Sequence, residues 1–148
     1  TDNRNLPGAG AAGGLGFAFT SYLRGTLRLG VEIVLDAVLP EEELSKDDII
    51  VTGEGRFDGQ TVMGKAPVGI AKRAKEKGCM VLVLAGSIDP QGVRKVQDEM
   101  QLIDGVFPIL PGVMTLEEAM EETVAYKNMC YTAEQLFRVV WKSRKWSE

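Results

Sequence analysis

The sequence contains no histidine and only two cysteines, Cys79 and Cys130. The absence of histidine excludes Ser-His-Asp and Cys-His catalysis, and it also excludes zinc sites with histidine ligands. The two cysteines lie far apart and match no metal-ligand spacing, so we expect reduced thiols in a reducing compartment. Any chemistry must therefore come from carboxylates, lysine, arginine, backbone amides or a metal held by carboxylates.

The sequence also has little that would bind a membrane or a nucleic acid. No apolar run approaches the ~18–20 residues that a membrane helix requires, and no stretch has the pattern of a signal peptide. The net charge is −4, whereas nucleic-acid binding calls for a basic face. We therefore expect a cytoplasmic protein with neither kind of partner.

The pattern of apolar residues predicts an α/β fold with a parallel sheet. The length of 148 residues suits one domain. Short β-branched runs alternate with segments of helical periodicity, which is typical of βαβ units. The predicted elements are strands over 48–52, 79–86 and 106–110, and helices over 66–77, 90–101 and most of 116–143.

The N-terminal part has a different texture. Residues 7–16, PGAGAAGGLG, form a glycine-rich loop that leads into a helix over the apolar stretch 17–27. Residues 31–39 fit either a helix or a short buried strand. We therefore divide the chain into a glycine-rich and helical segment, 1–45, and a βαβ-type segment, 46–148.

The segment from Thr52 to Lys65 carries the densest group of polar side chains, and it follows the first predicted strand. In open α/β sheets, ligands bind at the carboxyl ends of the strands. Arg56 and Lys65 can hold phosphate or carboxylate oxygens. Glu54 and Asp58 can bind Mg²⁺ or accept a proton. A simple turn with a surface ion pair is the alternative interpretation.

Glycines are expected to shape the backbone at two places. Gly53 and Gly55 can adopt positive φ and allow a close approach to a ligand. The segment 8–16 can cradle phosphates through its backbone N–H groups, although it can equally serve close helix packing or a hinge. The GxGxxG match within it is weak evidence for a dinucleotide site, because no predicted strand precedes it.

Four segments resemble the bacterial glycerate kinase family. They are PGAGAAGGLG at 7–16, VEIVLDAV at 31–38, DDIIVTGEGRFDGQTVMGKAPVGIAKRAK at 47–75 and VLVLAGS at 81–87. The resemblance implies an enzyme that uses ATP and Mg²⁺ to phosphorylate D-glycerate. It also implies a fold of two α/β domains with the active site in the cleft between them, of which this chain would be a three-layer, parallel-sheet portion.

The resemblance also implies which residues form the site. The expected catalytic residues are Glu54, Arg56, Asp58 and Lys65, with Asp58 as the metal ligand. The expected substrate- or phosphate-binding residues are Gly8, Gly10, Gly13, Gly14, Gly53, Gly55, Gln60, Thr61 and Gly64.

Family members are longer, so the resemblance implies that this chain corresponds to their C-terminal part. We expect it to be inactive without an N-terminal part of the same enzyme and to be capable of forming a homo-oligomer. The alternative is a non-catalytic nucleotide- or anion-binding module, or a self-associating α/β module.

Overall fold

The computed structural model describes residues 2–39, 43–61 and 65–145. The chain divides into two compact units, Thr1–Val38 and Leu39–Glu148. The N-terminal unit holds helices α1 (Ala11–Tyr22) and α2 (Gly30–Val38). The segment that fits either a helix or a strand is therefore helical.

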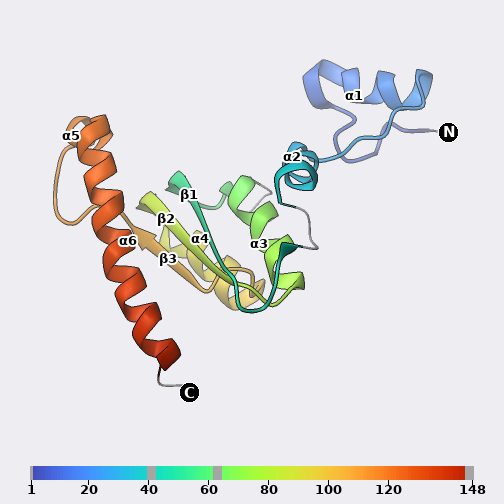
Figure 1. Ribbon diagram of the computed structural model, residues 1–148. Helices are drawn as coiled ribbons and strands as arrows, with labels where there is room; N and C mark the ends of the chain where they lie inside the picture. Colours follow the sequence, from blue (N-terminus) through green and yellow to red (C-terminus); the bar gives the residue numbers. More distant parts are fainter. Residues whose placement is uncertain (1, 40–42, 62–64, 146–148) are drawn as a thin grey trace. The chain divides into compact units, whose positions relative to one another are not determined.

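The C-terminal unit is built on a three-stranded parallel sheet with the order β1-β2-β3 (Figure 1). This confirms the α/β class and the parallel pairing. The strands are β1 (Ile49–Phe57), β2 (Met80–Ile88) and β3 (Gly105–Pro108), and the helical elements are α3 (Ala66–Glu76), α4 (Pro90–Arg94), the π-helical η3 (Lys95–Glu99), α5 (Leu116–Met120) and α6 (Glu122–Lys145).

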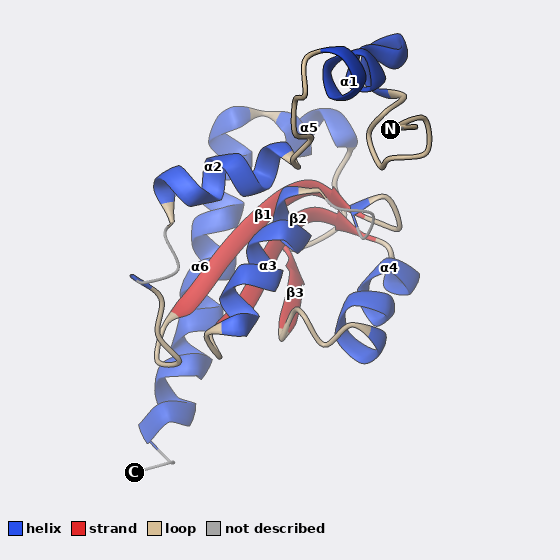
Figure 2. Ribbon diagram, turned by 90° about the vertical axis from the view of Figure 1, so that its right-hand side faces the viewer, coloured by secondary structure: helices blue, strands red, loops and turns tan. Residues whose placement is uncertain are grey.

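Helices cover both faces of the sheet, because successive side chains of a strand point to opposite faces. On one face, α3 packs through Val68 and Ala71 against a core that includes Val81 and Val83 of β2. On the other face, α6 packs through residues that include Leu136 against the β2 side chains that point away from α3. Figure 2 shows α3 and α6 on opposite sides of the sheet. The result is a three-layer unit.

Helix α3 begins and ends where the sequence predicts. Pro67 lies in its first turn, where a missing N–H costs nothing. Gly78 follows its end with φ of 77°, a conformation that glycine adopts without strain. The buried residues of α3 recur at helical spacing on the face toward the sheet.

Strand β1 is longer than predicted. We expected the strand to end at Thr52 and a loop to begin at Gly53. Instead β1 continues to Phe57, because β2 is equally long and provides pairing partners up to Ile88. Gly53 and Gly55 thus lie in the extended strand, and the prediction that they adopt positive φ was wrong.

Gly86 of β2 lies where the backbones of β1 and β2 come very close, since a Cβ there would be 2.6 Å from the carbonyl oxygen of Gly55. We expect Gly86→Ala to lower the free energy of unfolding by about 1–3 kcal/mol, because backbone atoms would have to move. Urea denaturation measures this. Gly59→Ala is the matched control, since nothing lies within 4 Å of its Cβ position. Equal stability of both variants would contradict the prediction.

The two remaining helical predictions are correct in place but not in continuity. The predicted helix over 90–101 is α4 followed by η3. The predicted helix over 116–143 is interrupted at Glu121, where ψ is 126°. The Glu121 carboxylate accepts hydrogen bonds from Thr123 and Val124 and so caps α6. Thr115 and Glu118 match the capping-box pattern in the sequence, and the box is present at the start of α5.

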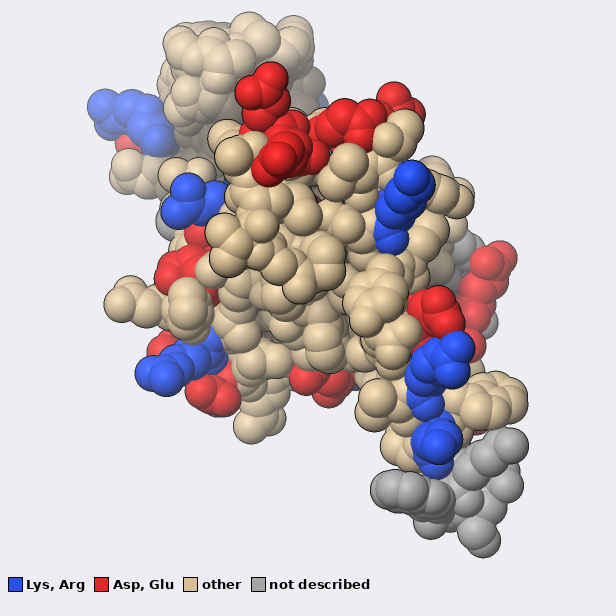
Figure 3. Space-filling model, turned by 90° about the vertical axis from the view of Figure 1, so that its left-hand side faces the viewer, with Lys and Arg blue, Asp and Glu red and all other residues tan. Residues whose placement is uncertain are grey.

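The outer surface of the C-terminal unit is apolar around α6. Exposed apolar side chains include Tyr126, Phe137 and Val139, and a groove of about 660 Å³ lies between α6 and Ile49 of β1. Figure 3 shows a broad expanse without charged side chains on this side. Among the described residues β1 pairs on one side only. Within the same ranges no helix combines the length and apolar character that a bilayer-crossing segment needs.

Candidate active site

The polar groups of the candidate site gather around the carboxyl-terminal half of β1. Glu54, on this strand, has one carboxylate oxygen 2.9 Å from the Nζ of Lys65. Its other oxygen accepts a hydrogen bond of 2.7 Å from the hydroxyl of Thr61. The Glu54 side chain is only 20% exposed, and both of its carboxylate oxygens have partners. Two residues that the sequence places well downstream are therefore held against the strand.

The turn after β1 is organised by Asp58. Its Oδ1 accepts hydrogen bonds from the backbone N–H groups of Gln60 (2.9 Å) and Thr61 (3.3 Å). Its Oδ2 lies 3.5 Å from the Nε of Arg56. The hydrogen bond from Gln60 is the main cause that lowers the pKa of Asp58, with smaller contributions from Thr61 and the two nearby cations. The carboxylate is consequently ionised at neutral pH.

The two cations are more accessible than the two carboxylates. The side chain of Arg56 is 73% exposed and that of Lys65 is 42% exposed, whereas that of Asp58 is 23% exposed. Lys65 also immediately precedes α3, and the N-terminus of a helix favours anions. Positive charge therefore faces outward and negative charge lies behind it, an arrangement that suits an anionic ligand.

The structure brings together most of the predicted site residues. Those gathered on β1, on the turn and at the start of α3 are Gly53, Glu54, Gly55, Arg56, Asp58, Gln60, Thr61 and Lys65. Gly64 lies outside the described residues. Gly8, Gly10, Gly13 and Gly14 belong to the N-terminal unit.

The glycine-rich segment runs into α1, which begins at Ala11 and ends at Tyr22, so the prediction of a loop over 7–16 and a helix over 17–27 was wrong in its bounds. Positive φ angles occur at Gly8 (88°) and Gly14 (95°), and residues 12–14 depart from helical geometry within α1. The segment folds back on itself, because a Cβ at Gly16 would lie 2.3 Å from the carbonyl oxygen of Gly8. Gly16 thus has a packing reason, whereas nothing lies within 4 Å of a Cβ at Gly10, Gly13 or Gly14. The predicted phosphate-binding role of the glycines stays a prediction.

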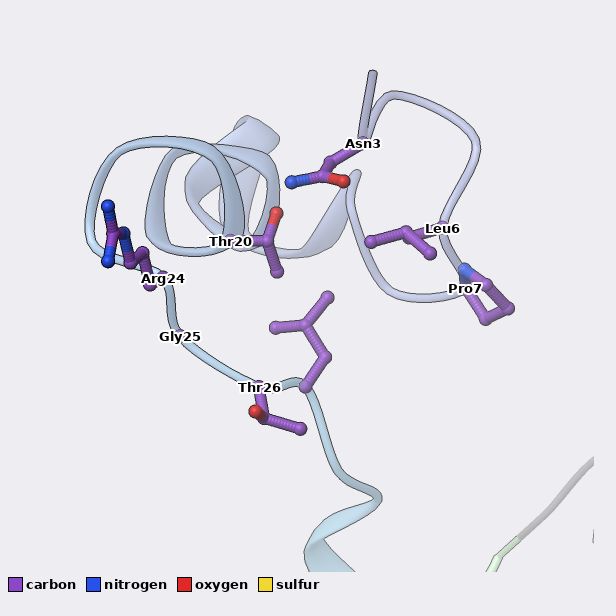
Figure 4. A pocket seen from close by; sticks show the side chains of 8 residues that line it. Asn3, Leu6, Pro7, Thr20, Arg24, Gly25 and Thr26 are labelled. Carbon is purple, nitrogen blue, oxygen red and sulfur yellow. The ribbon is translucent and has the colours of Figure 1, made fainter. Parts of the chain in front are cut away.

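An open cavity of about 480 Å³ lies within the N-terminal unit (Figure 4). It is formed by the chain before Gly8, by α1 and by the chain that follows α1. Its lining residues are Asn3, Leu6, Pro7, Thr20, Arg24, Gly25, Thr26 and Leu27. The predicted glycine positions 8, 10, 13 and 14 do not line it, although Pro7 is adjacent to them.

Sequence reasoning missed two polar residues at the end of β2. Ser87 pairs in register with Arg56, and the backbone N–H of Asp89 donates to the carbonyl of Phe57 at 2.8 Å. The Asp89 carboxylate caps α4. The signal was available, since both residues follow a buried strand that is parallel to β1, and the carboxyl ends of parallel strands share one edge.

Few side chains of the candidate site are available to bind a magnesium ion. Among residues 2–39, 43–61 and 65–145, no group of three acidic or thiol side chains could hold a metal. Magnesium is commonly held by one or two carboxylates together with phosphate oxygens. Asp58 can take such a role through Oδ2, whose partner is the Arg56 guanidinium at 3.5 Å, whereas the two Glu54 oxygens have closer partners at 2.7 and 2.9 Å.

Comparison with known proteins gives consistent results. The model of the glycerate kinase family matches residues 1–141. The chain is 45% identical over 141 residues to a glycerate kinase of Bacillus cereus, covering 95% of this chain and 35% of that protein. It is 42% identical over 130 residues to the glycerate 2-kinase of Escherichia coli, covering 87% and 32%.

A solved structure agrees with the sequence matches. A Salmonella typhimurium LT2 protein assigned as glycerate kinase 2 superposes with a TM-score of 0.52 and 36% sequence identity. The superposition covers 88% of this chain and 34% of that one. The chain thus spans about a third of the length of the curated relatives that it matches.

Proposed function

The chain belongs to the glycerate kinase family, and from this premise we propose that it contributes part of the active site of an enzyme that phosphorylates D-glycerate with ATP. The observation that carries the proposal is the cluster at the end of β1. Arg56 and Lys65 face outward there, beside the ionised carboxylate of Asp58. This combination of charges matches what a phosphoryl transfer requires.

The cations would bind the oxygens of the transferred phosphoryl group. Phosphoryl transfer needs charge neutralisation and alignment more than covalent participation by the protein. Lys65 acts as a compact positive charge, while the guanidinium of Arg56 can make paired hydrogen bonds to phosphate oxygens. Lys65 is already held by Glu54, so its position is prepared before a ligand arrives.

Asp58 is better suited to hold a cation than to accept a proton. Its lowered pKa makes it a weak base. A magnesium ion bound by Asp58 and by ATP would supply positive charge to the phosphate oxygens. Asp58 itself would hold that charge in place through the oxygen that now faces Arg56.

The rest of the active site would come from another part of the enzyme. We propose that the active-site cleft is completed by the part of the family sequence that this chain does not match. We also propose that the enzyme is cytoplasmic. The unpaired side of β1 and the exposed apolar side chains of the groove along α6, Phe137 and Trp141, support this, because such surfaces are usually covered by further structure.

A coupled ADP-release assay with D-glycerate and Mg-ATP tests the proposal. We define the complete enzyme as a fusion of this chain with the part of the Bacillus cereus relative that the chain does not match. The 148-residue chain alone is assayed beside this fusion. We expect activity in the complete enzyme alone. Activity in the chain alone would place the whole site in these residues. Inactivity of both as folded proteins would contradict glycerate as the substrate.

A further inference from the structure

Thr61 differs from the other residues of the candidate site in that its side chain is inaccessible. Its exposed fraction is 0%, and it is the one polar residue among the fully buried side chains of the described chain. A ligand could not reach its hydroxyl without displacing the surrounding core. The sequence-based expectation that Thr61 binds substrate or phosphate is therefore difficult to reconcile with its burial.

Thr61 joins three parts of the site through its hydroxyl and its backbone carbonyl. It donates a hydrogen bond of 2.7 Å to Glu54 and accepts one of 3.2 Å from the backbone N–H of Asp58. The carbonyl oxygen of Arg56 is a longer alternative acceptor at 3.4 Å. The Thr61 carbonyl in turn accepts a hydrogen bond of 3.3 Å from the N–H of Lys65. The strand, the turn and the start of α3 are thus linked through one residue.

Glu54 connects Thr61 to the accessible ammonium of Lys65. The carboxylate oxygen that does not bind Thr61 lies 2.9 Å from the Lys65 ammonium. A hydrogen bond to one oxygen restricts the rotation of the carboxylate and so restricts where the other oxygen points. Because Lys65 has a long flexible side chain, its ammonium would otherwise sample many positions.

We propose that Thr61 is a positioning residue that acts through Glu54 and Asp58 and does not contact the substrate. Its hydroxyl orients the Glu54 carboxylate, which places the Lys65 ammonium, and it fixes the turn that presents the Asp58 carboxylate. Glu54 has the same character, since it acts on the reaction through Lys65. This inference rests on the proposed function for its kinetic consequence, but not for its structural one.

Two substitutions at one position separate this role from that of an ordinary core residue. Thr61→Val keeps the shape but removes the hydroxyl, whereas Thr61→Ser keeps the hydroxyl. In the complete enzyme we expect Thr61→Val to lower kcat at least about tenfold with a smaller change in KM, because misplacement of catalytic groups affects the transition state most. Thr61→Ser should retain kcat within about threefold. Thr132→Val, in the middle of α6, is the control for the same chemical change.

A spectroscopic measurement on the 148-residue chain tests the structural part of the proposal and requires no enzymatic activity. The ammonium resonance of Lys65, assigned by its loss in Lys65→Ala, is followed by NMR of ¹⁵N-labelled lysine side chains. We expect an ordered resonance in the unaltered chain and in Thr61→Ser, and its loss in Thr61→Val. Glu54→Gln retains an acceptor for Thr61 but no charge for Lys65, so it should also lose the resonance.

The possible outcomes are distinct. An ordered Lys65 resonance in folded Thr61→Val overturns the proposal, as does a kcat equal to that of the unaltered enzyme. If Thr61→Val does not fold, Glu54→Gln and Thr61→Ser decide: an ordered Lys65 in Glu54→Gln, or a disordered one in Thr61→Ser, overturns it. If the complete enzyme does not phosphorylate glycerate but the resonances behave as expected, the proposed function fails and the positioning role stands.

Discussion

Replacing Lys65 by alanine is expected to lower kcat of the complete enzyme at least about 100-fold while the protein stays folded. The ammonium is the accessible cation that the structure holds in a defined place, 2.9 Å from Glu54 and at the start of α3. Charges fixed in advance where negative charge develops contribute strongly to catalysis, because they need no reorganisation during the reaction. Removal of an exposed side chain should cost little stability.

Steady-state kinetics with Mg-ATP and D-glycerate measure the effect, and circular dichroism checks the fold. Lys72→Ala is the matched control, since Lys72 is an exposed lysine on the same helix and lies outside the candidate site. Lys65→Arg should recover only part of the rate, because a planar guanidinium does not reproduce a compact ammonium. A folded Lys65→Ala enzyme with near-normal kcat would remove Lys65 from the catalytic residues.

Asp58→Asn is expected to reduce kcat by a similar factor of at least about 100, for a different reason. The amide oxygen can still accept the hydrogen bonds from Gln60 and Thr61, so the turn should persist. The negative charge beside Arg56 is lost, and with it the ligand that we propose for magnesium. The magnesium concentration needed for half-maximal rate should therefore rise together with the fall in kcat.

The pH dependence of the unaltered enzyme provides an independent check on Asp58. Its pKa is lowered in the folded state, so its charged form stabilises the fold at pH values above the unfolded pKa, and that contribution is lost as the pH falls through the folded pKa. Titration of Asp58 should therefore leave no inflection in the plot of kcat against pH in the neutral range.

The control for Asp58→Asn is Asp98→Asn, which changes an exposed carboxylate of η3. Equal rates for these two variants would exclude a catalytic role of Asp58.

The course of the chain through the C-terminal unit could largely be predicted from the sequence. The β-branched runs, the periodicity of α3 and the capping box at Thr115 depend on neighbours within a few residues, and such local preferences are legible in the pattern. The family, too, is evident from contiguous segments. The end of β1 was mispredicted because its length depends on pairing with β2, which is distant in the sequence.

The sequence by itself determined the α/β class, the boundaries of α3, the family and the group of residues from which the candidate site is drawn. Only the tertiary structure decided how those residues divide between accessible and buried positions. Arg56 and Thr61 belong to the same short motif, yet one side chain is 73% exposed and the other is fully buried. The reason is that burial depends on the packing of β1, α3 and α4 around the turn. The same packing brings Glu54 within reach of both Thr61 and Lys65.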